Sequence, residues 1–374
     1  MLFKTPVLGN KELEVIKEID ALKSKLGYML HAPSRWYGLL SRITLSRAIK
    51  GSNTIEGYNI TKDDAAAVVE GEEPFNEKAE AWMANECYRR AMTYVLQAAD
   101  DPYFKHSEML IKSLHFMMLE YKIDKSPGQW RPGYINVVND QTKEIVYVGP
   151  DAELVPALIS EFVDSLANPA REVPSIIHAA MAHLNITMIH PFRDGNGRMA
   201  RCIQTLVLVR DGTKASKFSS IEEYLGKPKN TLEYYDVLAK VGMGKWSPEN
   251  DALPWIQFCL TAHYIQALTT LRRTNEMQKV WEILELEVKK RGLPERTVLA
   301  LSDAAFGYRV RNVRYRKNAD VEDQTASRDL KRLVDANLLI PQGNARARYY
   351  VASDFVKQIR DQNRENREIT RPFG

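Results

Sequence analysis

The sequence has few cysteines, little net charge and no long apolar run. It therefore lacks the features that mark disulfide-rich, nucleic-acid-binding or membrane proteins. Its 374 residues include three cysteines, Cys87, Cys202 and Cys259, which lie far apart without metal-ligand spacing, so we expect reduced thiols. A formal net charge of +4 does not by itself indicate a nucleic-acid partner. No apolar run approaches the roughly eighteen residues of a membrane span, and the amino terminus lacks a signal-peptide pattern. We therefore expect a cytoplasmic protein without a membrane partner.

The residues that are present indicate a helical globular chain. The composition, with 44% hydrophobic and 27% charged residues, is ordinary for such a protein, and the length allows two or three domains. Apolar residues recur at helical spacing through most of the chain, which predicts a mainly α fold. The helices expected from this spacing cover much of 13–103 and the ranges 108–121, 152–167, 173–189, 197–210, 234–241 and 253–274.

Residues 190–201, with the sequence HPFRDGNGRMAR, combine the parts of a phosphoryl-transfer site. The turn Gly195-Asn196-Gly197 can direct its backbone N–H groups toward one point, and a helix that begins there favours an anion at the same place. Arg198 and Arg201 are three residues apart, so both project from one side of that helix and can bind a polyphosphate.

The same segment supplies an acid and a base. Asp194 is a hard oxygen ligand of the kind that Mg²⁺ prefers, with phosphate oxygens as its other ligands. His190 can accept a proton near neutral pH, because the pKa of an unperturbed imidazole lies there. The segment therefore predicts binding of a nucleotide and activation of a hydroxyl group.

This segment resembles the signature of the Fic family, HPFx(D/E)GNGRxxR, at every fixed position. In that family the histidine deprotonates a target hydroxyl, which attacks the α-phosphate of ATP. The resemblance implies that His190 is the base, that Asp194 binds Mg²⁺ and that Phe192 anchors the loop in the core. It also implies an anion nest and a phosphate clamp, formed by Gly195, Asn196 and Gly197 and by Arg198 and Arg201. The alternative is a capped helix N-terminus with solvated arginines, but capping requires neither the histidine nor the second arginine.

A second resemblance lies upstream, in the sequence SNTIEG that begins at Ser52. Ser52 and Glu56 are four residues apart and share one face of the helix expected from Trp36 to about Glu56. The pattern is similar to the inhibitory motif (S/T)xxxE(G/N) of Fic proteins that carry their own N-terminal inhibitory helix. It implies that Glu56 pairs with Arg201 and so occupies the guanidinium group that should receive the γ-phosphate. The alternative is an ordinary helix end followed by glycine.

Two β-rich runs, 131–138 and 144–150, are joined by a turn at 139–143 and predict a hairpin. Fic proteins have a hairpin flap here, which covers the nucleotide and aligns the target protein by strand pairing. The resemblance places four residues closest to the nucleotide: Val146, Tyr147, Val148 and Gly149. The alternative is a surface hairpin without a role.

A paired tyrosine motif follows the signature, at Tyr234 and Tyr235. In the family such residues begin a late helix and pack on the adenine, so Tyr234, Tyr235 and Leu238 are the candidate adenine contacts. Two positions depart from the family pattern, Thr231 in place of an arginine and Gly242 in place of an asparagine. Core packing is the alternative for the tyrosine pair.

His183 is a further histidine near the signature, and with His178 and His190 it could suggest a metal cluster. The three residues are spaced by five and seven positions rather than three or four, so they do not share one helix face as zinc ligands do. We expect His183 to pack in the core or to support a neighbouring group.

The chain divides into a helical region at 1–105 that carries the inhibitory motif, a Fic core at 106–274, and a third domain at 275–374. In the third domain, a helix at 280–288 and a second helix within 324–340, which runs into a strand, precede a hairpin at 341–351. This is the order of a winged helix-turn-helix. The cations that could contact DNA phosphates are Arg328, Lys331, Arg346 and Arg348. A protein-binding or dimerising winged helix is the favoured alternative, because four acids interrupt the basic face: Glu322, Asp323, Asp329 and Asp335.

Together these features predict Mg²⁺-dependent transfer of AMP from ATP to a Ser, Thr or Tyr hydroxyl of a protein, including self-modification, with Glu56 as the inhibitor. Two alternatives stay open. One is a Fic enzyme that removes AMP or transfers another phosphate-containing group, and the other is a nucleotide-responsive DNA-binding regulator. The intact His190 favours an enzyme, since a sensor could bind phosphate without it. The target protein, the signal that frees Arg201 and the formation of a homodimer are left open by the sequence.

Overall fold

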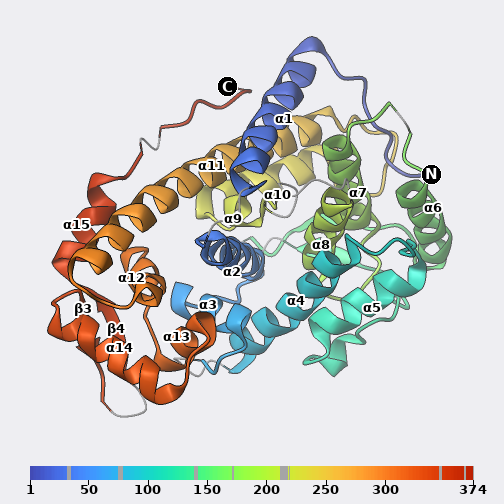
Figure 1. The fold of residues 1–374 in the computed structure, drawn as a ribbon. Helices are drawn as coiled ribbons and strands as arrows, with labels where there is room; N and C mark the ends of the chain where they lie inside the picture. Colours follow the sequence, from blue (N-terminus) through green and yellow to red (C-terminus); the bar gives the residue numbers. More distant parts are fainter. Residues whose placement is uncertain are drawn as a thin grey trace.

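The computed structural model describes residues 1–31, 35–74, 79–138, 142–170, 172–210, 218, 220–344, 348–365 and 368–373. Helices dominate the described chain, and its strands form two small antiparallel hairpins (Figure 1). This mainly α architecture confirms the predicted fold class. None of the helices in the described ranges combines the length and apolar character that crossing a bilayer requires.

Four helices form the N-terminal region, and the second of them carries the predicted inhibitory motif. The four are α1 (Asn10–His31), α2 (Tyr37–Ile55), α3 (Lys62–Glu70) and α4 (Ala79–Ala98). The N-cap of α3 is Thr61, whose hydroxyl accepts a hydrogen bond from the backbone N–H of Asp64 at 3.1 Å. The helix ends at Gly71, whose left-handed φ of 68° directs the chain toward the C-terminal part of the molecule.

The centre of the molecule is built on α7 (Ser175–Ile189) and α8 (Asn196–Val209). Nearly all residues of both helices are buried, because neighbours cover them all round. The side chains of α7 are apolar on nearly all sides, whereas α8 also buries a polar face with Arg198, Arg201 and Gln204. The chain between them, 190–195, contains the first half of the signature. The surrounding elements are α5 (Glu108–Leu119), α6 (Val155–Ala167), α9 (Glu222–Leu225), α10 (Pro228–Gly242) and the 3₁₀ turns at Ile123–Lys125 and Ala152–Leu154.

A single 38-residue helix, α11 (Leu253–Lys290), joins the core to the C-terminal part. The sequence analysis predicted a helix end near Asn275 and a second helix from Val280, and this prediction is wrong. No proline or glycine occurs between Pro254 and Gly292, so nothing interrupts the backbone hydrogen bonds. The helix ends where Gly292 adopts a φ of 65°. The proposed boundary between 274 and 275 therefore falls inside a continuous helix.

The C-terminal unit consists of short helices and a hairpin. In order it contains a 3₁₀ turn (Glu295–Thr297), α12 (Val298–Ala305), α13 (Asn312–Ala319), α14 (Asp323–Asp335), β3 (Leu339–Gln342), β4 (Tyr349–Ala352) and α15 (Asp354–Gln362). Val310 pairs with Tyr350 and adds a bridge to the edge of the hairpin. The winged helix-turn-helix stays our prediction for this arrangement. Arg346, one of the predicted DNA contacts, lies outside the described residues.

Two hydrophobic cores hold the fold together. The first surrounds α7 and α8 and includes residues from Phe3 to Ala262. The second combines the C-terminal unit with parts of the N-terminal helices, including Leu30, Leu40 and Ala66, and with the second half of α11. The N-terminal helices therefore belong to both cores, so the C-terminal unit packs directly on the region that carries the inhibitory motif.

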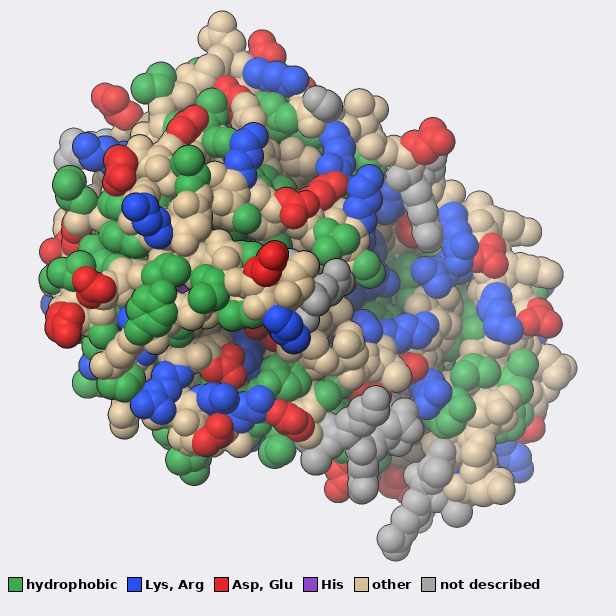
Figure 2. Space-filling model, turned by 180° about the vertical axis from the view of Figure 1, so that it is seen from behind, with side chains coloured by type: hydrophobic (Ala, Val, Ile, Leu, Met, Phe, Trp, Pro, Cys, Tyr) green, Lys and Arg blue, Asp and Glu red, His purple; other side chains and the backbone are tan. Residues whose placement is uncertain are grey.

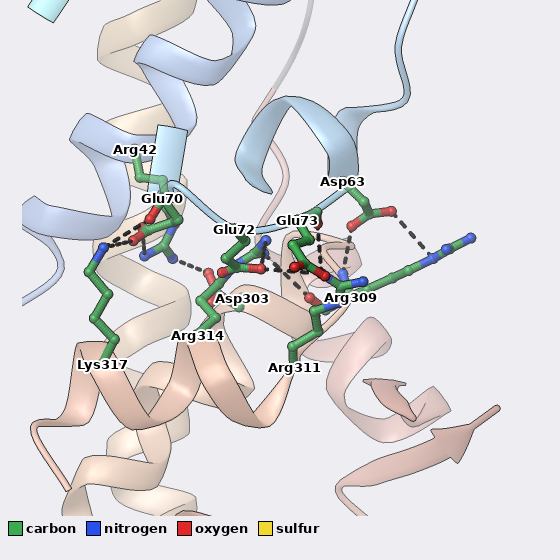
Figure 3. Close-up of polar contacts among 10 residues, drawn as sticks. All are labelled: Arg42, Asp63, Glu70, Glu72, Glu73, Asp303, Arg309, Arg311, Arg314 and Lys317. Carbon is green, nitrogen blue, oxygen red and sulfur yellow. Dashed lines mark hydrogen bonds and ion pairs between the residues drawn. The ribbon is translucent and has the colours of Figure 1, made fainter. Parts of the chain in front are cut away.

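Ion pairs reinforce this contact between the N-terminal region and the C-terminal unit (Figure 3). Glu72, in the loop after α3, receives two hydrogen bonds from the guanidinium group of Arg314 on α13, at 2.7 Å and 3.2 Å. Arg42 on α2 pairs with Glu70 and with Asp303 on α12. Because all five of these side chains are at most 12% exposed, the pairs lie in the contact rather than at its edge.

Candidate active site

His190 ends α7, and its backbone adopts a left-handed φ of 50° that turns the chain sharply toward α8. Its Nδ1 lies 3.1 Å from the carbonyl oxygen of Thr187. Since a carbonyl only accepts, Nδ1 carries the hydrogen and Nε2 keeps a free lone pair. Burial lowers the pKa of His190 to about 4, so the imidazole is neutral at pH 7. Nε2 is therefore available to accept a proton.

The loop after His190 is fixed by its own side chains. Phe192 is fully buried and stacks on His115, with ring centroids 3.6 Å apart. The side-chain amide of Asn196 accepts a hydrogen bond from the backbone N–H of Phe192 and donates one to its carbonyl oxygen, both at 2.9 Å. Asn196 thus shapes the loop, with its side chain turned inward. The anchoring role predicted for Phe192 agrees with this packing.

His115 on α5 supports the loop from the other side. Its Nδ1 accepts a hydrogen bond from the backbone N–H of Gly128 at 2.8 Å, so its Nε2 carries the hydrogen and donates to the carbonyl oxygen of Asp194 at 2.9 Å. Burial lowers the pKa of His115 to about 4 and keeps it neutral. The sequence analysis assigned no role to His115, and a lone histidine on a helix gives no signal of one.

The glycines of the signature allow close approach at the start of α8. Gly195 has a φ of 76°, and a Cβ atom there would lie 2.4 Å from Leu119 Cδ1. A Cβ atom on Gly197 would lie 2.7 Å from Glu56 Oε1 and 3.1 Å from Arg201 Nη1. The Glu56 carboxylate therefore lies over the first turn of α8, where backbone N–H groups and the helix dipole favour negative charge.

Arg201 binds the end of α2 through two of its three side-chain nitrogens. Its Nε donates to Ser52 Oγ at 2.7 Å, and its Nη2 donates to Ser52 O at 3.1 Å and to Glu56 Oε1 at 2.7 Å. Burial alone would lower the pKa of Arg201, but the Glu56 charge outweighs it and the pKa is raised. The structure thus brings together Ser52, Glu56 and Arg201, as the inhibitory motif implies.

Both arginines of the signature have donors without partners. Arg198 is fully buried, and its Nη1 donates to the hydroxyl of Tyr121 at 3.1 Å. Its Nε and Nη2, and Nη1 of Arg201, have no hydrogen-bond partner among the described residues. An unpaired buried donor costs about 1–3 kcal/mol, so an anion at the start of α8 would be bound by donors that are already in place.

Asp194 presents one carboxylate beside these arginines. Its side chain is 30% exposed, and its Oδ1 accepts the backbone N–H of Gly195 at 2.6 Å and lies 3.8 Å from Arg198 Nη2. Within the described ranges, no three His, Cys, Asp or Glu side chains come together as metal ligands. One partly exposed carboxylate next to a phosphate-binding turn fits Mg²⁺, which is commonly bound by one or two carboxylates together with phosphates and water.

The predicted flap is a hairpin of β1 (Asn136–Val138) and β2 (Ile145–Val148), and residues 139–141 of its turn lie outside the described residues. Gly149 follows β2, and a Cβ atom there would lie 3.8 Å from His190 Cβ, so the hairpin ends beside the histidine. Val148 is also bound on its other side, because its N–H donates to Gly244 O at 3.0 Å and its carbonyl accepts from Trp246 N at 2.9 Å. Val146 is partly exposed on the same strand.

Tyr147 on β2 points into the core rather than toward the site. Its ring is 7% exposed, and its hydroxyl donates to Met188 O on α7 at 2.8 Å. It therefore fixes the hairpin to the helix that carries His190. A contact between the Tyr147 backbone and a nucleotide stays a prediction.

Arg131 joins three backbone segments behind the histidine, and the sequence analysis missed it. The residue is 3% exposed; its Nε donates to His190 O at 2.9 Å, its Nη1 to Gly133 O at 2.6 Å, and its Nη2 to Pro150 O. Both ends of the flap are thereby tied to the His190 turn. An arginine in front of a proline gave no signal of this role, because it acts through contacts distant in sequence.

The candidate adenine contacts lie on α10 in different environments. Tyr234 is 2% exposed, packs among Trp255 and Phe258, and shares a hydrogen bond with His183 Nε2 at 3.0 Å. Tyr235 is half-exposed, and its hydroxyl lies 3.4 Å from Ile55 O at the end of α2. Leu238 is partly buried. Tyr235 and Leu238 can still contact a ligand, whereas Tyr234 packs in the core together with His183.

The end of α2 is held over α8 by a close helix contact that the sequence analysis also missed. A Cβ atom on Gly51 would lie 2.2 Å from Glu222 O, and one on Gly226 would lie 2.5 Å from Gly51 Cα. Only glycine permits this approach of α2 to α9. Glu222 is buried there and receives hydrogen bonds from the hydroxyls of Tyr88 and Ser220.

Comparisons with known proteins agree with this geometry. The Fic/DOC family profile matches residues 105–208, which include the hairpin, the His190 turn and α8. A protein adenylyltransferase Fic of Nematostella vectensis is 24% identical over 270 residues, covering 68% of this chain and 55% of that protein. The protein adenylyltransferase fic-1 of Caenorhabditis briggsae is 38% identical over 72 residues, 18% of this chain and 14% of that protein. The chain therefore spans about half or less of the curated relatives it matches.

The fold is also similar to solved structures. A Fic family protein from Desulfovibrio desulfuricans G20 superposes with a TM-score of 0.59 at 19% identity, covering 94% of this chain and 98% of the other. A helical core with a hairpin beside a histidine turn and a glycine-rich helix start defines a Fic domain, which is an enzymatic domain. Residues 105–208 of the chain therefore form a Fic/DOC family domain.

Proposed function

We propose that this protein transfers AMP from ATP to a hydroxyl group of a protein side chain. The observation that carries the proposal is the arrangement at the start of α8. A neutral His190 lies beside a turn that favours anions, next to two buried arginines with donors free for phosphate oxygens. The matched relatives are named protein adenylyltransferases, and this name describes the same chemistry.

In the proposed reaction, a Ser, Thr or Tyr hydroxyl of the target gives its proton to His190 Nε2. The hydroxyl oxygen forms a bond to the α-phosphorus of ATP, and the bond from that phosphorus to the β-phosphate oxygen breaks, so pyrophosphate leaves. Arg198 and Arg201 would bind the β- and γ-phosphates. Asp194 would hold Mg²⁺, which would neutralise charge on the phosphates when bound.

The structure described here supports an inhibited state of this reaction. The Glu56 carboxylate occupies the first turn of α8 and binds Arg201, so the γ-phosphate would have to share that place with a negative charge. At about 3 Å such a contact is strongly unfavourable in a buried site. ATP would then lie with its α-phosphate out of line with the target hydroxyl, and the protein would need a signal that moves Glu56.

The target would bind along the flap. Among the described residues β1 pairs only with β2, so its other edge presents backbone groups to an extended segment. Such binding depends little on side chains, which allows several targets. We include the protein itself among these targets, because a hydroxyl of its own chain could be presented in the same way.

The partner of the C-terminal unit stays open between DNA and protein. Asp329, counted in the sequence analysis among the acids that interrupt the basic face, is 1% exposed and binds Arg296 and Tyr315 instead. Arg328 and Lys331 remain exposed on α14. A groove of about 1430 Å³ beside them is lined by both charges, including Glu72 and Asp323. This mixed lining favours a protein, and a homodimer is included in that proposal.

The experiment that tests the proposed function compares ATP labelled on the α-phosphate with ATP labelled on the γ-phosphate. The Glu56→Gly variant is used together with the parent, so that inhibition does not hide the activity. Retention of α-label and absence of γ-label on protein supports AMP transfer. Retention of γ-label, or of neither label, contradicts it.

A second part of the experiment distinguishes AMP transfer from the alternative, AMP removal. Protein that carries α-labelled AMP is freed of ATP and incubated with parent and Glu56→Gly protein. Loss of label that requires Glu56 would make this chain an enzyme that removes AMP, with Glu56 orienting water. Stable label in both incubations supports transfer as the main activity.

A further inference from the structure

A cavity of about 650 Å³ opens between α2, α9, α11, α15 and the C-terminal segment 368–373. It contains none of the residues of the proposed AMP-transfer site. In the space-filling view from behind, a hollow opens between the larger body and the C-terminal unit, and Lys and Arg side chains gather around it (Figure 2). Its size lies within the range of small-molecule sites, roughly 300–1,000 Å³.

The lining of this cavity is strongly basic. Two of its described residues are acids, Glu223 and Glu276, and seven are cations: Arg47, Lys227, Arg272, Arg273, Arg360, Arg364 and Arg371. Glu276 already accepts the backbone N–H of Glu365 at 2.9 Å. Two carboxylates outside the lining also pair with these cations, Glu233 with Arg371 at 2.9 Å and Asp361 with Arg364 at 2.9 Å. The seven cations still outnumber these four carboxylates, so the cavity favours an anion.

Two of the arginines have buried donors without a partner. Glu223 binds Arg47 Nη1 at 2.8 Å and Arg273 Nη2 at 2.6 Å, which leaves Arg47 Nε and Arg273 Nη1 without a hydrogen-bond partner among the described residues. Arg273 is 7% exposed, so water does not readily satisfy it. An anion with several oxygens would bind both donors.

Lys227 lies among the same cations and adds to the excess of positive charge. It is the N-cap of α10, so the positive end of that helix dipole adds to the neighbouring cations. Partial burial lowers the pKa of Lys227, and the neighbouring guanidinium groups lower it further, although Glu223 acts in the opposite direction. A bound anion would relieve this repulsion.

The rest of the lining combines four apolar side chains, Ile43, Ile265, Phe306 and Ile369, with the polar groups of Tyr224, Asn230 and Thr269. These side chains can contact the organic part of a ligand whose charged part binds the arginines. A simple inorganic anion would leave them without a role. The cavity therefore suits a molecule with both a ring or chain and one or more phosphates.

We propose that this cavity binds a phosphorylated small molecule of nucleotide size. The proposal does not rest on AMP transfer, because its residues and its ligand are separate from that reaction. It has a structural link to the active site, since Arg47 lies on α2, which also carries Ser52 and is capped by Glu56 at its C-terminal end. The ligand would thus contact α2 between the C-terminal unit and the end that lies over α8.

Titration calorimetry of the full chain tests this proposal, with inorganic pyrophosphate and ADP as separate probes. The test variant is Lys227→Gln with Arg364→Gln, whose side chains lie on the surface and leave the Glu223 pairs intact. Its matched control is Lys289→Gln with Lys290→Gln, which removes two exposed charges from the end of α11. We expect the test variant to lose one binding site, with an affinity lowered at least about tenfold, and the control to bind as the parent does.

Identical isotherms of the parent and the test variant would overturn the proposal, since an anion bound only at the start of α8 does not depend on these residues. An equal loss in the control would overturn it too, by showing that only overall charge matters. The two probes distinguish an inorganic phosphate ligand from an organic one. Tighter binding of ADP than of pyrophosphate supports an organic ligand, and equal or weaker binding of ADP excludes one.

Discussion

At the scale of single residues, the proposed chemistry depends on which side chains are charged and which are neutral. His190 is neutral because burial lowers the pKa of its imidazole, and the hydrogen bond from its Nδ1 to Thr187 O leaves Nε2 free. Arg198 and Arg201 stay charged although they are buried, because Glu56 is close to both. A neutral base beside two fixed cations can accept a proton from a hydroxyl while the arginines hold the phosphates.

The first prediction concerns His190. In the Glu56→Gly background, His190→Ala should lower the rate of AMP transfer by roughly 100-fold to 10,000-fold, because it removes the base, and should leave ATP affinity nearly unchanged. Filter-bound α-label measures the rate, and calorimetry measures the affinity. His178→Ala is the control, since that histidine lies on the same helix and bonds to Ser165 O instead. A His190→Ala variant as active as its parent would exclude the role of base.

The residues of the signature could be predicted from the sequence. The residues that hold them in position could not. The signature names His190, Asp194 and the two arginines because they lie within twelve residues of one another. Arg131, His115 and Gly51 act through contacts with distant parts of the chain, which no local pattern records. Tyr234 packs in the core, as the alternative for the tyrosine pair expected, and its contact with adenine stays a prediction.

At the scale of elements, the position of α2 decides whether the start of α8 is covered. The C-terminal end of α2 is held by Arg201 and by the glycine contact with α9. Its N-terminal half packs in the second hydrophobic core, and Arg42 pairs with Glu70 and Asp303. Movement of α2 away from α8 would therefore disturb contacts in both halves of the molecule.

The second prediction concerns the ion pair that fixes α13 to the loop after α3. Glu72→Gln should lower the free energy of unfolding by about 3–5 kcal/mol, because it leaves the guanidinium group of Arg314 buried without its charged partner. Chemical denaturation measures the change. Asp323→Asn is the matched control: it weakens an exposed pair with Arg316 at 3.9 Å and should change stability by less than about 1 kcal/mol. Equal effects of the two substitutions would show that the Glu72 pair adds nothing to the contact.

The sequence predicted which segments form helices better than it predicted where each helix ends. The helix expected from Trp36 to about Glu56 matches α2 within about one residue at each end. The pattern failed at α11, where a polar stretch around Asn275 suggested a break that helix geometry does not require. A polar stretch can continue a helix when one of its faces is buried, and Thr274, Glu276 and Met277 are buried here.

At the scale of the whole molecule, the N-terminal helices join two hydrophobic cores into one fold. This arrangement could not be predicted from the sequence, because the division into three consecutive regions assumed that each has its own core. It also means that removing the chain after 274 would cut α11 and expose the second core. The function of the C-terminal unit is better tested by single substitutions than by truncation.

The third prediction concerns stability against pH, through His183 in the first core. Burial lowers the pKa of His183 to about 3, whereas a histidine in an unfolded chain has a pKa near 6.5. As pH falls below about 6.5, the unfolded state takes up a proton that the folded state does not, so stability is lost with acidification. At pH 5 this residue should cost about 2 kcal/mol relative to pH 8.

His183→Gln, which removes the titrating group, tests this prediction. The free energy of unfolding of parent and variant is measured by denaturation at pH 8 and at pH 5. The advantage of the parent should shrink by about 2 kcal/mol at the lower pH, or turn into a disadvantage. A constant difference between the two proteins would show that His183 is protonated in the folded state or that its environment is solvated.

The central claim is that Glu56 inhibits AMP transfer by occupying Arg201, and it is tested most directly by the rate of transfer from α-labelled ATP. Glu56→Gly should raise that rate by about 100-fold or more, since it restores one charged donor to the phosphate, and Glu56→Gly with Arg201→Ala should be inactive. Glu80→Ala, which removes an exposed carboxylate of α4, should leave the rate unchanged. A Glu56→Gly variant with the parent's rate or a lower one would contradict the account.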